Sequence, residues 1–247
     1  MKIGITERGD AGINLTWYDK LNSCDGAVII SKNFTDDFKE KVLSTPVPVI
    51  LHCTCTGYGG TPLEPNVPDY KVQLDALKDI IDSGFPAERC VLRVDPIFPS
   101  EKGLLRIELV LQYFMELDMG INRIRISIVD EYPHVKARYR KRGWKPLYGS
   151  AFQPSATQLQ MVADRLSKYP YIYETCAEPM LAYLADCFVE QGCISNVDLN
   201  LMGLPEIHTA ENPQRRKGCH CLSCKTELLD ARHPCSNRCV YCYWKNG

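Results

Sequence analysis

The sequence predicts an α/β fold, a parallel (β/α) barrel or partial barrel. Strand and helix signals alternate over 1–205, and parallel strands need crossover connections of this kind. Polar side chains that can bind ligands directly follow several of the predicted strands, as at the mouth of a barrel. The first predicted strand is not followed by Gly-x-Gly-x-x-Gly, which disfavours an open sheet of the dinucleotide-binding type.

The elements follow one another as six strand–helix units. The predicted strands are short apolar runs at 2–6, 26–31, 47–55, 89–94, 122–129 and 171–175. The predicted helices, most of them with apolar residues at helical spacing, lie at 13–21, 34–43, 68–84, 103–120, 134–142, 155–168 and 179–192. Ser155 is the expected N-cap of its helix, and Gly84 is expected to end the helix at 68–84. The alternation ends near Asn196, and 196–203 is predicted to be one more strand.

Ligand-capable side chains follow the predicted strands at Glu7, Arg8, His52, Cys53, Cys55, Asp95, Asp130, Glu131, Glu174 and Cys176. Because the carboxyl ends of parallel strands meet at one mouth of a barrel, we expect these side chains to gather there. The simpler interpretation is that polar loops begin wherever strands end.

Length and composition allow one large domain or two small ones. We expect a barrel over 1–205 and a cysteine-rich C-terminal segment over 206–247 that packs on the barrel mouth. The formal net charge of −1 excludes a general basic field for nucleic acid. The opening segment is short and charged, unlike a signal peptide, and no apolar run is long enough to span a bilayer. A cytoplasmic protein without a membrane partner is therefore expected.

The thirteen cysteines indicate metal or iron–sulfur ligation rather than disulfides. Cytoplasmic thiols stay reduced, and the count is odd. Six of the thirteen lie between Cys219 and Cys242, which is the clustering expected of a ligand set.

Cys235, Cys239 and Cys242 form a C-x3-C-x2-C motif close to the end of the sequence. Three thiolates at this spacing can hold three irons of a [4Fe-4S] cluster and leave the fourth iron open. In radical S-adenosylmethionine enzymes the methionine moiety of the cofactor binds that iron, and reduction of the cluster generates a 5′-deoxyadenosyl radical.

Four further residues are expected to bind S-adenosylmethionine or the substrate. Tyr241, directly before the third cysteine, is expected to lie along the adenine. Asp95, Asp130 and Glu174 are expected at the barrel mouth, where they would position the ribose or the substrate. The alternative for Asp95 and Asp130 is a helix-capping role.

Zinc is the competing interpretation of the same cysteines. Cys221-x2-Cys224, fourteen residues and then Cys239-x2-Cys242 are close to a zinc-ribbon spacing. A zinc ion on these four thiolates would leave Cys219 and Cys235 without a role, and it would not account for Cys176. Both interpretations stay open on spacing alone.

The sequence also contains, in order, the blocks "CTGYGGTPLEPNVP" (55–68), "RVDPIF" (93–98), "SIVDEY" (127–132), "TCAE" (175–178), "CIS" (193–195), "QRRKGCHC" (214–221) and "CSNRCVYCYW" (235–244). These blocks resemble an uncharacterised family, domain-of-unknown-function family eighteen-forty-eight. Its C-terminal cysteines are similar to the cluster motif of radical S-adenosylmethionine enzymes. The resemblance covers nearly the whole chain. It implies a rearranged radical-enzyme barrel in which the C-terminal end of the chain supplies the triad.

The family blocks contain four more cysteines, here Cys176, Cys193, Cys219 and Cys221. The resemblance implies that their thiolates ligate a second, auxiliary [4Fe-4S] cluster. Cys224 stands where the family usually has serine, so it is a possible substitute ligand. The alternative for Cys176 and Cys193 is that each is an ordinary buried cysteine.

The expected function is therefore that of a radical S-adenosylmethionine enzyme with a small-molecule or macromolecular substrate and an electron donor such as flavodoxin or ferredoxin. One alternative is a zinc- or cluster-bearing module that binds nucleic acid through the basic segment 134–145, which also holds Tyr139 and Trp144. Such a basic run is more often a solvated helix face. The other alternative is an iron–sulfur electron-transfer protein.

Overall fold

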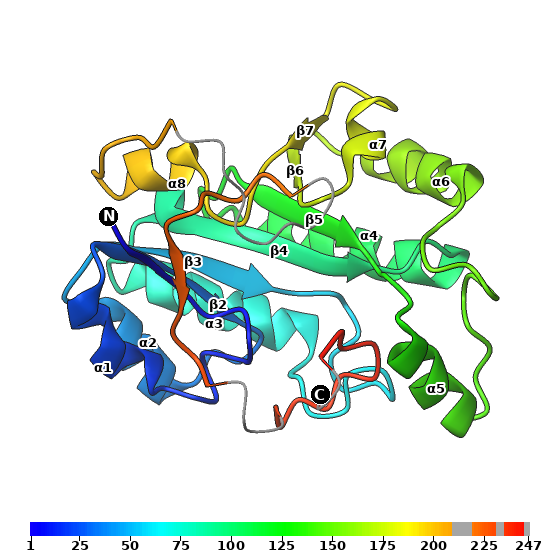
Figure 1. Cartoon of the computed structure of the whole chain (residues 1–247), viewed down its shortest axis with the longest axis horizontal. Helices are drawn as coiled ribbons and strands as arrows, with labels where there is room; N and C mark the ends of the chain where they lie inside the picture. The colour runs from blue at the N-terminus through cyan, green and yellow to red at the C-terminus, as the bar shows by residue number, and fades with distance from the viewer. Residues whose placement is uncertain (209–218, 231–234, 245–247) are drawn as a thin grey trace.

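The computed structural model describes residues 1–208, 219–230 and 235–244, whose strands form one eight-stranded parallel sheet (Figure 1). The strands are β1 (Ile3–Ile5), β2 (Gly26–Ser31), β3 (Val49–Thr54), β4 (Cys90–Ile97), β5 (Ile124–Ile128), β6 (Tyr173–Thr175), β7 (Phe188–Glu190) and β8 (Lys225–Glu227). Their order in the sheet is β7-β6-β5-β4-β3-β2-β1-β8, so β7 and β8 are edges and the sheet is not closed. The structure thus confirms the α/β fold in the form of a partial parallel barrel.

Most predicted helices are present with slightly different ends. The α-helices are α1 (Trp17–Lys20), α2 (Asp36–Leu43), α3 (Tyr70–Asp82), α4 (Glu101–Leu117), α5 (Pro133–Lys141), α6 (Ala156–Leu166), α7 (Pro179–Ala182) and α8 (Asn196–Leu201). The predicted N-cap of α6 is confirmed. The Ser155 side chain accepts a hydrogen bond from the backbone amide of Gln158, and the Gln158 side chain accepts one from the backbone amide of Ser155. The helix predicted over 13–21 is shorter than expected.

The helix predicted over 179–192 is wrong in its second half. Only its first four residues form α7, and a strand, β7, follows beside β6. The sequence pattern misled because three apolar residues have the spacing of one helix face: Leu181, Leu184 and Phe188. In the structure they reach the core from a helix, a turn and a strand, respectively.

The strand predicted over 196–203 is also wrong, because this stretch forms α8. The Ser195 side chain accepts a hydrogen bond from the backbone amide of Asp198, and the Asp198 side chain accepts one from the backbone amide of Ser195. This capping box favours a helix over a strand. Nothing in the sequence predicts β8, because Lys225–Glu227 contains no apolar residue.

Both faces of the sheet are buried, as expected for parallel strands. In β2, Ala27 and Ile29 belong to the apolar cluster under α1 to α4 and α6. Val28 and Ile30 point to the other face, which we call the inner face, where they join the cluster that includes Leu199 of α8. In the described part of the chain, no helix combines the length and the apolar character needed to cross a membrane.

The last strand determines where the cysteine-rich end of the chain goes. β8 pairs in parallel with β1, with Glu227 opposite Ile5. The chain therefore leaves β8 at the edge of the sheet where the other strands have their carboxyl ends. In Figure 1 the red segment 235–244 lies beyond the arrowhead of β3 and next to α5.

Candidate metal centre

The segment 235–244, which we call the triad loop, carries the C-x3-C-x2-C cysteines and lies against the loop that follows β3. The backbone amide of Val240 donates to the carbonyl of Leu63 at 2.9 Å. The side chain of Asn66 donates to the carbonyl of Ser236 at 2.6 Å. These bonds hold the C-terminal cysteines at the carboxyl edge of the sheet, where the sequence predicted a barrel mouth.

The buried carboxylate of Asp10, after β1, anchors the triad loop from the other side. Asn237 donates to Asp10 Oδ2 at 2.8 Å. Asn33 donates to the same oxygen at 3.1 Å and to Asn237 Oδ1 at 2.8 Å. The second oxygen of Asp10 accepts from the Ser31 hydroxyl at 2.7 Å and from the Gly12 amide at 3.0 Å. Since Asp10 and Asn237 are only 4% and 2% exposed, these bonds are shielded from water.

Replacing Asn237 by aspartate is expected to loosen the triad loop. The new carboxylate would face Asp10 in a buried site and could no longer donate to it, at a cost of about 1–3 kcal/mol for the unsatisfied groups. After iron reconstitution, the variant should lose iron to a chelator faster than the unchanged protein. Asn66→Asp alters an exposed bond to the same loop and should change this rate little. Equal rates for the two variants would contradict the anchoring role of Asn237.

Among the thiols of the triad loop, the charges of Cys235 and Cys242 act on the pKa of Cys239, and the charge of Cys242 acts on the pKa of Cys235. Burial raises the pKa of Cys239 to about 12, Lys32 opposes this rise, and the charges of Cys235 and Cys242 add to it. Burial also raises the pKa of Cys235 and of Cys242. Without a metal these thiols stay protonated at neutral pH, so metal binding must release their protons. Three thiols on one short loop are a donor set that suits an iron–sulfur cluster.

A buried ion pair adjoins Cys239. Glu64 is 0% exposed, and its Oε1 accepts from Lys32 at 2.8 Å and from the hydroxyl of Tyr241. Burial lowers the pKa of Lys32, but Glu64 and Cys239 raise it, and the net shift is upward, so the ammonium group of Lys32 stays charged. Glu64 Oε2 is buried and has no hydrogen-bond partner among the described residues. A buried carboxylate oxygen without a donor is costly, and it is a suitable acceptor for a cationic group of a ligand.

Tyr241 is a buried, well-packed residue of the triad loop. Its ring is 7% exposed and packs edge-on against Phe98, with 5.4 Å between the ring centroids. Lys32 Nζ lies 5.7 Å from the centroid of the Tyr241 ring. Burial, followed by the charge of Glu64, raises the pKa of Tyr241 well above its ordinary value, so the hydroxyl keeps its proton and donates. Its contact with adenine stays a prediction.

The four cysteines expected to hold an auxiliary cluster also come together, on the inner face. Cys176 Sγ lies 3.2 Å from Cys193 Sγ, and the Cys193 amide donates to Cys221 Sγ at 3.1 Å. The bond with Cys193 lowers the pKa of Cys221, but a bond with Cys219 and burial raise it, to about 11. Cys224, the possible substitute ligand, lies beside the sheet, where its backbone carbonyl accepts a hydrogen bond from the amide of Ile3.

The cysteines fall into two groups that differ from the zinc-ribbon pairing. Cys221 lies with Cys193 and Cys219, whereas Cys239 lies with Cys235 and Cys242. Within residues 1–208, 219–230 and 235–244, no group of three or more His, Cys, Asp or Glu side chains has an arrangement that could hold a metal ion. Ligands of one zinc ion converge on one centre, whereas each thiolate of a four-iron cluster binds a different iron.

The charge of Asp95 acts on a residue of each cysteine group. The bond with Cys193 and burial raise the pKa of Cys176, and the charge of Asp95 adds to that rise. Burial is the main cause of the raised pKa of Tyr241 in the triad loop, and Asp95 contributes there too. Asp95 also forms an ion pair with Arg93.

Glu174 belongs to a buried network of ion pairs on the inner face. Its Oε1 accepts from Arg123 Nε at 2.7 Å, and its Oε2 accepts from Arg125 Nη2 at 2.5 Å. Arg123 also pairs with Asp198 at 2.8 Å, and Arg125 is 0% exposed. Both oxygens of Glu174 are therefore engaged by guanidinium groups, and its role in cofactor binding stays a prediction. Asp130 is half-buried after β5, and its role in cofactor binding also stays a prediction.

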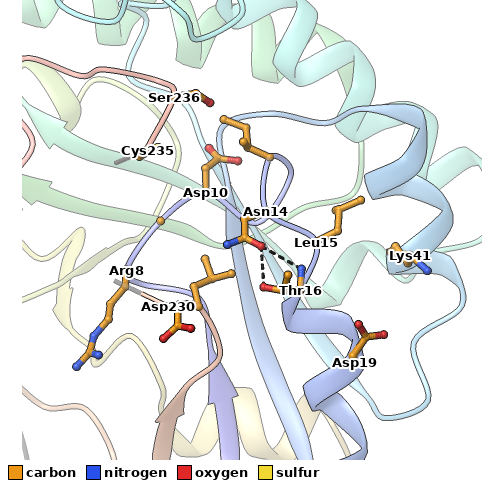
Figure 2. A pocket seen from close by; sticks show the side chains of 13 residues that line it. Arg8, Asp10, Asn14, Leu15, Thr16, Asp19, Lys41, Asp230, Cys235 and Ser236 are labelled. Carbon is orange, nitrogen blue, oxygen red and sulfur yellow. Dashed lines mark hydrogen bonds between the residues drawn. The ribbon is translucent and has the colours of Figure 1, made fainter. Parts of the chain in front are cut away.

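A cavity of about 610 Å³ opens beside Cys235, at the loop between β1 and α1 (Figure 2). Its lining mixes apolar and charged side chains, among them Arg8, Ile13, Leu15, Asp19, Lys41 and Asp230. Because Cys235 and Ser236 line the same cavity, a small polar molecule could reach the triad loop from this side.

Sequence reasoning missed Lys32, Glu64, Asp10 and Asn237. Lys32 directly follows a predicted strand, so the argument from strand ends could have found it. Glu64 lies in a Gly- and Pro-rich loop, and Asn237 lies between two cysteines. Neither position carries a signal of its own, because their importance depends on partners far away in the chain.

A family model described as "Domain of unknown function (DUF1848)" matches residues 17–244, which include the triad loop. No curated protein and no solved structure matches the chain.

Proposed function

The chain belongs to the DUF1848 family, and from the geometry of its cysteines we propose that it is an iron–sulfur enzyme of the radical S-adenosylmethionine class. Cys235, Cys239 and Cys242 would hold three irons of a [4Fe-4S] cluster, and S-adenosylmethionine would bind at the open iron. The observation that carries the proposal is the triad at the carboxyl edge of a parallel sheet, beside the buried Glu64.

The residues around the triad fit a cofactor with an amino acid moiety. Glu64 Oε2 has no partner among the described residues, so it would accept a bond from the ammonium group of S-adenosylmethionine. Lys32 lies near Cys239, where its charge would offset the negative charge of a ligated cluster. When bound and reduced, the cluster supplies the electron that cleaves the sulfonium bond of the cofactor. The part of the chain is to bind the cofactor, orient it and exclude water.

An auxiliary cluster is the second part of the proposal. Cys176, Cys193, Cys219 and Cys221 come from two strand ends and from a segment far along the chain, yet they lie together on the inner face. Four thiolates can ligate a cluster completely, so it would not bind S-adenosylmethionine. Asp95, whose charge acts on a residue of each group, would contact a substrate held between them.

The test is anaerobic reconstitution with iron and sulfide, followed by reduction in the presence of S-adenosylmethionine. The protein should take up about four irons per cluster and release 5′-deoxyadenosine, slowly even without substrate. One bound zinc and no iron would favour the zinc-bearing module. A reducible triad cluster that never yields 5′-deoxyadenosine would favour an electron-transfer protein and overturn the enzyme assignment.

A further inference from the structure

We propose that the exposed cations at the end of α5 form a docking surface for an acidic one-electron carrier protein, which delivers its electron to the triad cluster. This inference rests on the proposed function, because that function needs one electron for each cleavage of S-adenosylmethionine. It adds the place where the electron enters and the charge of the protein that brings it.

α5 is fastened directly to the triad loop. The guanidinium group of Arg138 donates to the carbonyl oxygens of Val240 at 3.2 Å, Cys242 at 2.5 Å and Trp244 at 2.5 Å. His134, on the same helix, is hydrogen-bonded to the carbonyl of Tyr243 at 2.7 Å. A protein that binds α5 would therefore sit next to the backbone that holds the third cysteine. Figure 1 shows α5 beside the C-terminal segment, at the carboxyl edge of the sheet.

The charge of the segment 134–145 is of one sign. The segment 134–145 contains six Lys or Arg residues and no Asp or Glu, in a chain whose net charge is −1. Two of the six turn inward, because Arg138 binds the triad loop and Lys136 donates to backbone carbonyls after α5. The other four are exposed to solvent: Arg140, Lys141, Arg142 and Lys145.

The burial of the aromatic rings in the segment 134–145 favours a protein partner over nucleic acid. Single-stranded nucleic acid is held by bases that stack on open aromatic faces. Tyr139 is only 4% exposed and belongs to an apolar cluster with Val135 and Tyr241, and Trp144 packs against that cluster. Both rings of the segment 134–145 pack in or against that cluster, so this segment offers charge without an open aromatic face. The exposed rings nearby, Tyr243 and Trp244, belong to the triad loop. Charge alone suits a transient redox complex, which has a small interface and depends on electrostatic steering.

The test is the rate at which a flavodoxin hydroquinone, an acidic flavin carrier, reduces the reconstituted cluster in stopped-flow measurements at several salt concentrations. The triple variant Arg140→Glu, Lys141→Glu, Arg142→Glu should lower the bimolecular rate about tenfold or more at low salt and flatten its salt dependence. A control triple variant, Lys71→Glu, Lys102→Glu, Lys168→Glu, makes the same change in net charge at exposed positions on other elements. It should have a much smaller effect.

Photoreduced deazaflavin, a small reductant that needs no docking, should bleach the cluster equally in all three proteins. If it does, and flavodoxin reduces the two triple variants at the same rate, the docking inference is wrong and the proposed function stands. If deazaflavin bleaches no cluster in the unchanged protein, the proposed function fails and this inference fails with it. Binding of single-stranded RNA that only the α5 variant loses, with flavodoxin reduction unaffected, would assign the surface to nucleic acid instead.

Discussion

Replacing Cys239 by alanine is expected to remove about four irons per chain and to abolish the formation of 5′-deoxyadenosine. Cys239 is the middle ligand of the triad, and the charges of Lys32 and Glu64 both act on its thiol. With only two thiolates left, the cluster is no longer held, and the open iron that defines this chemistry is lost with it. Iron and sulfide content, visible absorption and product analysis after reduction measure the effect.

Two matched variants make this result specific. Cys90→Ala removes a buried cysteine at the start of β4, at the opposite end of the strands, and should leave both iron content and product unchanged. Cys193→Ala should remove the auxiliary cluster and leave about four irons at the triad. Should Cys239→Ala keep its full iron content and still release 5′-deoxyadenosine, the triad is not the site of the reaction.

Glu174→Gln is expected to destabilise the fold by about 3 kcal/mol, the lower end of the range for breaking a buried ion pair by changing one partner. The carboxylate of Glu174 compensates the buried guanidinium groups of Arg123 and Arg125. The substitution leaves Asp198 as the nearby carboxylate, at 2.8 Å from Arg123 and 4.0 Å from Arg125. Urea denaturation followed by circular dichroism measures the change in the free energy of unfolding.

Glu101→Gln is the control for this variant. Glu101 also pairs with an arginine, Arg165, but its side chain is 68% exposed, so its loss should cost less than about 1 kcal/mol. The comparison also tests the cofactor role predicted for Glu174 from the sequence. A variant of normal stability that no longer binds S-adenosylmethionine would show that Glu174 serves the ligand and not the fold.

The sequence by itself determined most of the elements and the chemical character of the site. Strands such as 26–31 and helices such as 68–84 are specified by residues within a few positions of one another, so local spacing suffices to predict them. The triad is equally local, since its three cysteines span eight residues, 235–242. The error at 179–192 arose where a local pattern fits two structures and packing against the sheet selects one. The error at 196–203 arose because the local capping box of Ser195 and Asp198 was overlooked.

Only the tertiary structure decided how the triad is held at the carboxyl edge of the sheet and what surrounds it. A three-residue strand without apolar side chains, β8, returns the chain to β1 and sends it out at the carboxyl edge. The Glu64–Tyr241 bond spans 177 positions and the Asp10–Asn237 bond spans 227. No short window contains both partners of such bonds. They form because the rest of the sheet already holds the two loops together, so that little chain entropy remains to be lost when they close.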